Sequence, residues 1–534
     1  MMTLLPTKGM FHPGESVQVE TRGSGDGDVV VLHLGDEVSR APAVAGGIVD
    51  LGPLPPGGYG LEWRAAAGAV LARTAVDVRV DPRSRLRYGF TADFSPGRDA
   101  AGLAETVRRL HLTGVQFYDW AYRHADLLGG GPEYLDPLGR TIALETVRRL
   151  VAAVQDAGAA ALGYAAVYAV GNDEWAQWQH DALLRPDGSA WSLGDFLRIV
   201  DPSAADWLDH FTADLRASTD QVGFDGFHLD QYGYPKTARR ADGAVVDVAD
   251  AFDRMIAAVR TALPEARLVF NQVNDFPVWV TGSAEQDAVY IEPWEPQTTL
   301  ASLATLVERA KAAGEGRPVV LAAYQHVYDE ADAAGADRAA ALTMATLFSH
   351  GATQLLVGEA DRILVDPYYV RNHRVESSTA DLLRRWYDFA VEYDELLFEP
   401  AIADVTAAYA GAYNDDLDVT YADAPVATGC RAGAVWRRIT KIGDRLVLHL
   451  INLTGQDDDQ WDAPRRPFGA TGAGTLRVRS VAGAVPRVRV ADPDTMPRLV
   501  DVPVDLDADA ATATLPPVGA WQVVVVDLVP ERVP

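Results

Sequence analysis

The chain has 534 residues, of which 48% are hydrophobic and 23% are charged, as in ordinary globular proteins. This length corresponds to roughly two to four domains, or to one large domain with smaller ones attached. A formal net charge of -28 repels phosphate backbones and anionic lipid, so we expect neither nucleic acid nor a membrane as a partner, whereas a neutral ligand such as a sugar is unaffected.

Compartment and cofactors are indicated by what the sequence lacks. Cys430 is the single cysteine, so no intrachain disulfide can form. The first residues show no basic segment followed by an apolar segment long enough for a signal peptide, and no apolar run is long enough to span a bilayer. We therefore expect a cytoplasmic protein, with secretion still open. Because there is no HExxH motif and no EF-hand calcium loop, we expect no metal and no cofactor.

The first region, residues 1–85, has the pattern of a small β-sandwich. Short alternating or β-branched runs such as SVQVET and TAVDVRV are separated by clusters of Gly, Pro and Asp such as PLPPGG. After residue 396 the β pattern returns in runs such as DRLVLHLINLTG and AWQVVVVDL, so we expect residues 396–534 to form a C-terminal β-sandwich.

Between these regions, residues 86–395 alternate short apolar runs with segments of helical period. This count and order fit a (β/α)8 barrel, the TIM-barrel fold, better than an open sheet. The expected strands are residues 87–94, 114–120, 161–169, 223–230, 267–273, 288–294, 318–324 and 352–359. The expected helices are residues 101–112, 145–158, 203–218, 251–264, 303–314 and 338–351.

Polar and aromatic residues gather where the expected strands end. In such a barrel the active face is built at the carboxyl ends of the strands. A strand-end Asp or Asn taken alone is as often a helix cap or a turn residue. Its recurrence at nearly all eight ends indicates a functional ring instead. The residues concerned are Asp93, Asp119, Trp120, Tyr168, Asp230, Asn271, Asn274, Glu292, Tyr324 and Glu359.

The run GFDGFHLDQYG, residues 223–233, holds three ionisable groups in an apolar strand. Asp230 ends the strand and Gly233 permits a tight turn after it, so we expect the Asp230 carboxylate to face a pocket. His228 lies inside the strand, where a hydrogen-bonded structural histidine is favoured over a proton shuttle. Asp225, at the start of the strand, is expected to pair with or cap a neighbouring group.

The run YIEPWEP, residues 290–296, supplies a second carboxylate. Glu292 follows an apolar strand and lies near Trp294, whose bulk would desolvate the carboxyl group and raise its pKa, as suits a general acid. Glu295 is the competing choice, since it lies further into the same loop. Two carboxylates among aromatic residues are the equipment of a glycosidase, because sugars stack on rings and glycosidic bonds are cleaved by paired acids.

Several runs together resemble glycoside hydrolase family 66, whose members are endo-dextranases and cycloisomaltooligosaccharide glucanotransferases. They are RYGFTADF, VQFYDWAYRHADLL, YAAVYAV, GFDGFHLDQYG, FNQVN, YIEPWE and LLVGEADRILVDPYY. The resemblance implies an N-terminal immunoglobulin-like β-sandwich, a (β/α)8 barrel and a C-terminal β-sandwich. It also implies that Asp230 is the nucleophile, that Glu292 is the acid/base, and that Asp119 lines subsite −1.

The expected activity is therefore retaining hydrolysis of α-1,6-glucosidic linkages in dextran or isomalto-oligosaccharides through a covalent glycosyl-enzyme. Such a mechanism requires carboxyl groups about 5–5.5 Å apart. Glucanotransferase members of the family carry a carbohydrate-binding insertion after strand 7, and residues 318–342 leave no room for one, which favours hydrolysis. The alternatives are a transglycosylase that forms cyclic or longer isomalto-oligosaccharides and a non-catalytic glucan-binding protein. The expected substrate contacts are Tyr118, Asp119, Trp120, His124, Tyr168, Gln231, Asn271, Trp294, Tyr324 and Glu359.

Overall fold

The N-terminal strands form two antiparallel sheets around an apolar core that contains Leu61 and Trp63. The computed structural model describes residues 2–480, 485–507 and 509–528. In β2 the side chains of Val17, Val19 and Thr21 are buried and those between them are partly exposed, because successive side chains of a strand point to opposite faces. One sheet contains β1 (Thr3–Pro6), β2 (Ser16–Arg22) and β5 (Ile48–Pro53), and the other contains β3 (Gly27–His33), β4 (Asp36–Ala43), β6 (Gly57–Arg64) and β7 (Val70–Val78).

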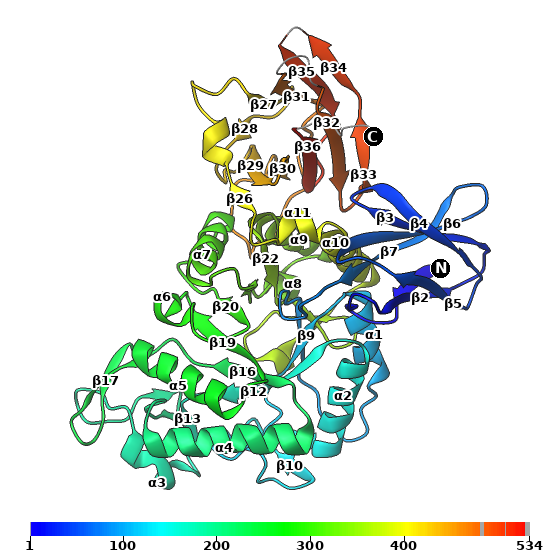
Figure 1. The fold of residues 1–534 in the computed structure, drawn as a ribbon. Coiled ribbons are helices and arrows are strands. Elements are labelled where there is room, and N and C mark those ends of the chain that lie inside the picture. Colours follow the sequence, from blue (N-terminus) through cyan, green and yellow to red (C-terminus); the bar gives the residue numbers. More distant parts are fainter. Residues whose placement is uncertain (1, 481–484, 508, 529–534) are drawn as a thin grey trace.

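Parallel strands form one curled sheet in the middle of the molecule (Figure 1). Each strand expected from the sequence contains at least one of them. All seven residues of β12 are buried, as in parallel strands covered on both faces. In sequence order the strands are β8 (Tyr88–Thr91), β9 (Gly114–Phe117), β12 (Ala160–Ala166), β16 (Gly226–Asp230), β19 (Arg267–Val273), β20 (Ala288–Glu292), β21 (Val319–Leu321), β22 (Ala352–Gln354) and β23 (Val357–Gly358).

The pairing of the last two short strands explains the curl. Strand β22 pairs with β21, while β23, a few residues further along, pairs with β8 through Gly358 and Phe90. The segment 352–358 therefore borders both ends of the parallel row. Short antiparallel strands extend the sheet at one end or lie in the loops that follow the parallel strands. They are β10 (Glu133–Leu135), β11 (Thr141–Ala143), β13 (Ala169–Gly171), β14 (Ser192–Leu193), β15 (Leu197–Ile199), β17 (Thr237–Arg239), β18 (Val245–Asp247), β24 (Arg362–Ile363) and β25 (His373–Arg374).

Helices occupy every segment expected to be helical. Thr299 and Ser302 form a reciprocal capping box at the start of α7, and Asp247 caps α5. Helix α9 is buried nearly all round because it packs against α7, α10 and the C-terminal strands. Helix α10 was not among the expected segments. The longer helices are α1 (Ala101–Arg109), α2 (Leu144–Asp156), α4 (Ala205–Val222), α5 (Val248–Ala262), α7 (Leu300–Ala313), α9 (Ala333–His350) and α10 (Ser377–Glu392), and the one-turn helices are α3 (Trp175–Trp178), α6 (Val278–Thr281), α8 (Val327–Glu330) and α11 (Asp394–Leu397).

The C-terminal strands form a seven-stranded and a four-stranded sheet around a separate apolar core, which includes Val435, Leu448 and Val524. The larger sheet contains β26 (Ala403–Asp404), β28 (Val426–Ala427), β29 (Val435–Ile442), β30 (Arg445–Asn452), β32 (Arg487–Asp492), β33 (Met496–Val502) and β36 (Trp521–Asp527). The smaller contains β27 (Leu417–Tyr421), β31 (Gly474–Arg479), β34 (Val504–Asp507) and β35 (Ala510–Leu515).

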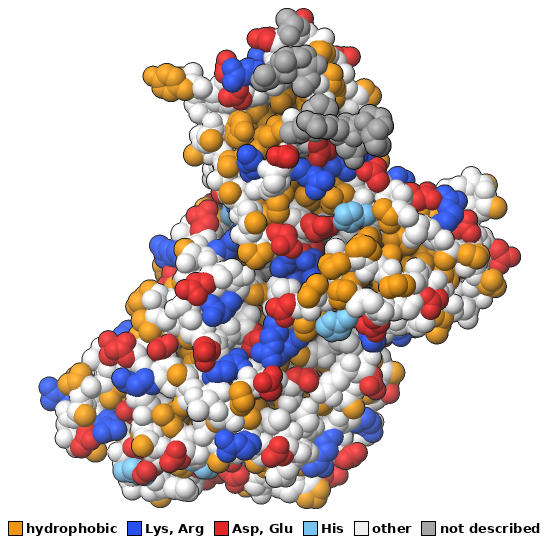
Figure 2. All heavy atoms as spheres, in the orientation of Figure 1, with side chains coloured by type: hydrophobic (Ala, Val, Ile, Leu, Met, Phe, Trp, Pro, Cys, Tyr) orange, Lys and Arg blue, Asp and Glu red, His pale blue; other side chains and the backbone are white. Residues whose placement is uncertain are grey.

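The distribution of surface charge and the apolar character of the helices concern the expectation that neither nucleic acid nor a membrane is a partner. On the face shown in Figure 2, acidic and basic side chains are interspersed over the surface. Within the described ranges, none of the helices combines the length and the apolar character needed to cross a bilayer.

Candidate active site

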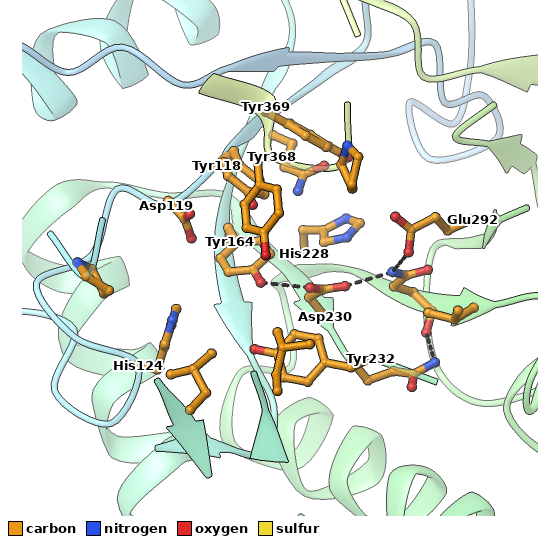
Figure 3. A pocket seen from close by; sticks show the side chains of 18 of the residues that line it. Tyr118, Asp119, His124, Tyr164, His228, Asp230, Tyr232, Glu292, Tyr368 and Tyr369 are labelled. Carbon is orange, nitrogen blue, oxygen red and sulfur yellow. Dashed lines mark hydrogen bonds between the residues drawn. The ribbon is translucent and has the colours of Figure 1, made fainter. Parts of the chain in front are cut away.

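A cavity of about 240 Å³ opens at the carboxyl ends of the central strands. A cavity of this order is large enough for a small ligand such as a sugar ring. Aromatic side chains form much of its wall, and Figure 3 shows several of them around Asp230. The aromatic lining residues are Tyr118, Tyr164, Phe196, Tyr232, Tyr290, Trp294, Tyr324, Tyr368 and Tyr369.

One amide group links the two predicted catalytic carboxylates. The Nδ2 of Asn271, on β19, donates to Asp230 Oδ1 at 2.7 Å and to Glu292 Oε2 at 3.0 Å. Those two oxygens are therefore separated by no more than the sum of the two distances, about 5.7 Å. Strands β16, β19 and β20 are neighbours in the sheet, so their carboxyl ends bring Asp230, Asn271 and Glu292 to one edge.

Two tyrosine hydroxyls also donate hydrogen bonds to the carboxylates of Asp230 and Glu292. Tyr164, on β12, donates to Asp230 Oδ2 at 2.7 Å, and Tyr324, which follows β21, donates to Glu292 Oε1 at 2.7 Å. Burial raises the pKa of both tyrosines well above the ordinary value, so they stay neutral donors. Each carboxylate thus accepts two hydrogen bonds from neutral groups and has no arginine or lysine within ion-pair distance among the described residues.

The electrostatics follow from that arrangement. Burial of the Asp230 carboxyl raises its pKa to about 7, the negative charge of Glu292 adds to the rise, and the hydrogen bonds from Asn271 and Tyr164 oppose it. Two acids held by one amide cannot both ionise without mutual repulsion. Asp230 therefore takes up a proton near neutral pH.

Asp119 is a third carboxylate in the wall. In the view of Figure 3 it lies on the opposite side of Asp230 from Glu292. Its backbone φ of 49° is in the left-handed region, where Asp and Asn are tolerated better than most residues, and its carbonyl accepts a hydrogen bond from Arg140 at 3.2 Å. Burial raises the pKa of Asp119 to about 7, although the charge of Arg140 opposes that rise.

Two histidines also line the cavity, and both stay neutral near pH 7. His228 Nδ1 lies 3.3 Å from the Tyr88 hydroxyl, and burial lowers the pKa of the ring to about 3. Burial, aided by the charge of Arg123, lowers the pKa of His124 to about 4. A neutral, buried His228 has the hydrogen-bonded character expected from its place inside the strand.

The structure brings most of the predicted site residues to this cavity. Asp225 lies apart, at the start of the strand, where its Oδ2 accepts from the Ala161 amide at 2.8 Å. Glu295 is exposed and outside the lining. Gln231 lines the cavity, but its side chain is bonded to the backbone of Asn271, Phe276 and Gly233. The predicted residues in the lining are Tyr118, Asp119, His124, Asp230, Gln231, Asn271, Glu292, Trp294 and Tyr324.

Trp120, Tyr168 and Glu359 lie outside the lining, and each supports backbone instead. Trp120 Nε1 donates to the Tyr164 carbonyl at 3.2 Å, and Tyr168 OH donates to the Tyr234 carbonyl at 2.7 Å. Glu359 Oε1 accepts from the amides of residues 92 and 93 at 2.6 and 2.9 Å. These side chains end strands, as expected, but they turn toward neighbouring loops.

Sequence reasoning missed several tyrosines of the cavity wall, among them Tyr164 and Tyr369. Tyr164 is paired in register with His228 on the neighbouring strand, so its alternation within β12 could have indicated an inward side chain. Tyr369 comes from the segment after β24 and stacks on Tyr118 with ring centroids 4.3 Å apart. No local pattern indicates that contact. Within the described residues, no group of three or more His, Cys, Asp or Glu side chains could hold a metal ion.

Known proteins share this fold and parts of this sequence. Two cycloisomaltooligosaccharide glucanotransferases of Niallia circulans are 27% and 26% identical to the chain over 365 and 374 residues, which is 60% and 61% of this chain. The chain matches only 38% of the length of each of these relatives. A crystal structure of a Paenibacillus sp. cycloisomaltooligosaccharide glucanotransferase with cycloisomaltoheptaose superposes with a TM-score of 0.85 at 19% identity, covering 98% of this chain and 100% of that one.

The sequence profile of glycosyl hydrolase family 66 matches residues 7–525, nearly the whole chain. This match confirms the resemblance seen in the strand-end motifs, and the crystal structure shows that the fold is shared. The protein belongs to glycosyl hydrolase family 66.

Proposed function

We propose that the protein is a retaining glycosidase that acts on α-1,6-linked glucans, with Asp230 as nucleophile and Glu292 as acid/base. The observation that carries this proposal is the Asn271 amide, which holds an oxygen of each carboxylate within about 5.7 Å of the other. Retaining enzymes hold their carboxyl groups about 5–5.5 Å apart, whereas inverting enzymes need about 6.5–9.5 Å to admit a water. The short separation favours direct attack by Asp230.

In the first step, Asp230 would attack the anomeric carbon while the bond to the leaving oxygen breaks and Glu292 gives that oxygen its proton. In the second step, Glu292 would remove a proton from water, whose oxygen displaces Asp230. The neutral donors Asn271 and Tyr164 would keep the Asp230 carboxylate oriented without neutralising its charge.

The cavity wall supports a neutral oligosaccharide as the ligand. We propose that Tyr118, Asp119, His124, Trp294 and Tyr324 contact the sugar, since rings pack on its C–H faces and Asp119 accepts hydrogen bonds from its hydroxyls. For Trp120, Tyr168 and Glu359 we propose a supporting role through the backbone that they hold.

We also propose how the chain is divided. The curled sheet and its helices correspond to a (β/α)8 barrel over residues 86–395, with an immunoglobulin-like β-sandwich over residues 1–85 and a β-sandwich over residues 396–534. Two apolar clusters lie wholly within the N-terminal and the C-terminal region, and a third is centred on the middle region and extends to Leu34 and Trp521 of its neighbours, which supports the division. The segment 352–358, which borders both ends of the parallel row, supports a closed barrel.

Transglycosylation is the second candidate, because the two curated relatives are named as glucanotransferases. In that reaction a sugar hydroxyl takes the place of water. Between β21 and α9 the chain has only residues 322–332, which contain the one-turn helix α8. This leaves no space for an inserted domain, and it is the observation that keeps hydrolysis as the first candidate.

The test is incubation with dextran and with isomalto-oligosaccharides, followed by sizing of the products and determination of the anomeric configuration by NMR. Shorter chains with a new α-configured reducing end would support retaining hydrolysis, while longer or cyclic products would support transfer. A new β-configured end would contradict the retaining mechanism. Binding without any product would point to a non-catalytic glucan-binding protein.

A further inference from the structure

The loop after β20 carries more than the proposed acid. Two residues after Glu292, the Trp294 side chain is 37% exposed and its ring centroid lies 6.1 Å from that of Tyr324, the residue that donates to Glu292. Because an acid must contact the leaving oxygen, groups beside Glu292 and away from Asp230 lie where the leaving part of the substrate sits. An acceptor enters by the same route, since the second step reverses the geometry of the first.

Asn274 fastens this loop to the end of β19. Its Oδ1 accepts from the Trp294 amide at 2.6 Å, and its Nδ2 donates to the Glu295 carbonyl at 3.0 Å. Its own backbone amide donates to the Glu292 carbonyl at 2.9 Å. Three hydrogen bonds from one residue therefore hold three residues of the loop that carries both the acid and the exposed indole.

The residue type fits both demands of this position. The backbone φ of Asn274 is 51°, in the left-handed region, where Asn is tolerated much better than most residues. The side-chain amide also offers a donor and an acceptor on two separate atoms. A carboxylate only accepts, an alkyl group does neither, and a hydroxyl would have to serve both partners with one oxygen. Asp275 follows with a φ of 60°, but its side chain pairs with Arg309 on α7, at 2.8 Å, and leaves the loop untouched.

We propose that Asn274 is a positioning residue that holds Trp294 as a platform for an acceptor sugar and so sets the ratio of transfer to hydrolysis. This inference rests on the proposed retaining mechanism. In either outcome, an oxygen nucleophile bonds to the anomeric carbon of the glycosyl-enzyme. The bond to Asp230 breaks, its electron pair returns to that carboxylate, and the proton of the nucleophile passes to Glu292.

The transfer-to-hydrolysis ratio distinguishes an effect on Trp294 from an effect on Glu292. Water and a sugar hydroxyl both use Glu292 as base, so a disturbance of Glu292 slows the two outcomes alike. Only the sugar gains from an indole face held in place, because water is too small to stack on it. A loosened Trp294 therefore lowers transfer relative to hydrolysis.

The test compares single variants on one isomalto-oligosaccharide at equal substrate consumption. Asn274→Gly keeps the left-handed backbone and removes the amide, and it should lower the transfer-to-hydrolysis ratio about threefold to tenfold, the range expected for a lost hydrogen bond. Asn274→Asp retains an acceptor for the Trp294 amide and should recover part of the ratio. Asp275→Gly, the matched control with the same backbone conformation and the same added freedom, should leave it unchanged.

A second measurement needs no turnover. Hydrogen exchange at the Trp294 amide should be faster in Asn274→Gly than in the wild type and unchanged in Asp275→Gly. An unchanged exchange rate would overturn the fastening role. An active wild type whose Asn274→Gly variant loses transfer and hydrolysis equally would overturn the platform, since the loop would then act on Glu292 alone. A wild type that makes no product from any glucan would instead overturn the proposed function, and the acceptor role with it.

Discussion

Two buried aspartates in this molecule are surrounded in opposite ways. Asp77, in β7, is fully buried and accepts from Arg79 at 2.6 Å and from Arg87 at 2.8 Å. Burial alone would raise the pKa of Asp77, but the charges of Arg87 and Arg79 outweigh it and hold the pKa below the ordinary value. Asp230 accepts from the neutral side chains of Asn271 and Tyr164 and faces another carboxylate, so burial raises its pKa to about 7.

The difference separates a carboxylate that joins parts of the fold from one that is available for chemistry. An aspartate neutralised by two arginines is a poor nucleophile and a poor base, because its oxygens are already bound to the two guanidinium groups. An aspartate held by neutral donors has no cation to offset its charge once it is ionised, and its pKa lies near the working pH. The absence of a cation next to Asp230, among the described residues, is therefore as informative as its presence next to Asp77.

The largest expected effect is on activity at Asp230. Asp230→Asn removes the nucleophile but keeps the size of the side chain, so turnover of dextran should fall at least about 10⁴-fold while the far-UV circular dichroism stays that of the wild type. Reducing-sugar release measures the loss. A loss of only about tenfold would mean that another residue is the nucleophile.

The second effect concerns Glu292. Glu292→Gln should slow hydrolysis of an unactivated glucan by about 10²–10⁴-fold, because a poor leaving group needs protonation. An aryl glycoside needs little, so its first step should survive, the glycosyl-enzyme should accumulate, and added azide, which needs no base, should restore turnover. Mass spectrometry and aryl release follow these steps.

Glu295→Gln is the matched control, since Glu295 lies on the same loop but is exposed. If Glu295→Gln shows this behaviour and Glu292→Gln does not, the acid is Glu295. If neither variant does, the acid lies on another strand.

At the other aspartate the effect should be on stability alone. Asp77→Asn leaves the buried Arg79 and Arg87 without their shared partner, which should cost roughly 3–5 kcal/mol of unfolding free energy. Urea unfolding measures the cost, and activity per folded molecule should remain that of the wild type. A fall in that specific activity at unchanged stability would contradict the division drawn between the two aspartates.

The smallest effect is the pH dependence, which should have opposite signs at the two sites. The folded pKa of Asp230, about 7, is above the ordinary value of 3.8, so its contribution to stability is complete below about pH 4 and is lost as the pH rises through 7. At pH 8, Asp230→Asn should therefore raise the free energy of unfolding by up to about 4 kcal/mol and raise the midpoint temperature with it. At pH 4 the substitution should have little effect on either.

For Asp77 the folded pKa is below the ordinary value, so its contribution is present above about pH 4 and is lost only as the pH falls further. Thermal unfolding of both variants from pH 3 to pH 8 tests the two signs together. If Asp230→Asn is destabilised at pH 8, ionised Asp230 does not lower the stability of the folded state.

Much of the site could be predicted because the carboxyl ends of parallel strands lie at the same edge of the sheet. Asp230, Asn271 and Glu292 were found by their positions at the ends of three apolar runs, and the structure places them together. The same rule named Trp120 and Glu359, which turn away from the cavity. Glu359 has a φ of 40°, in the left-handed region, so the direction of its side chain no longer follows the alternation of the strand.

By itself, the sequence determined the order of the parallel strands and of six helices between them, the positions of Asp230 and Glu292 at strand ends, and the family. These depend on local apolar period and on short motifs within single strands. Only the tertiary structure decided which groups surround those carboxylates. The bridging amide of Asn271, the stacking of Tyr369 on Tyr118 and the arginines around Asp77 join residues far apart in the chain. Such contacts depend on how the elements pack, and no periodicity within one element records its neighbours.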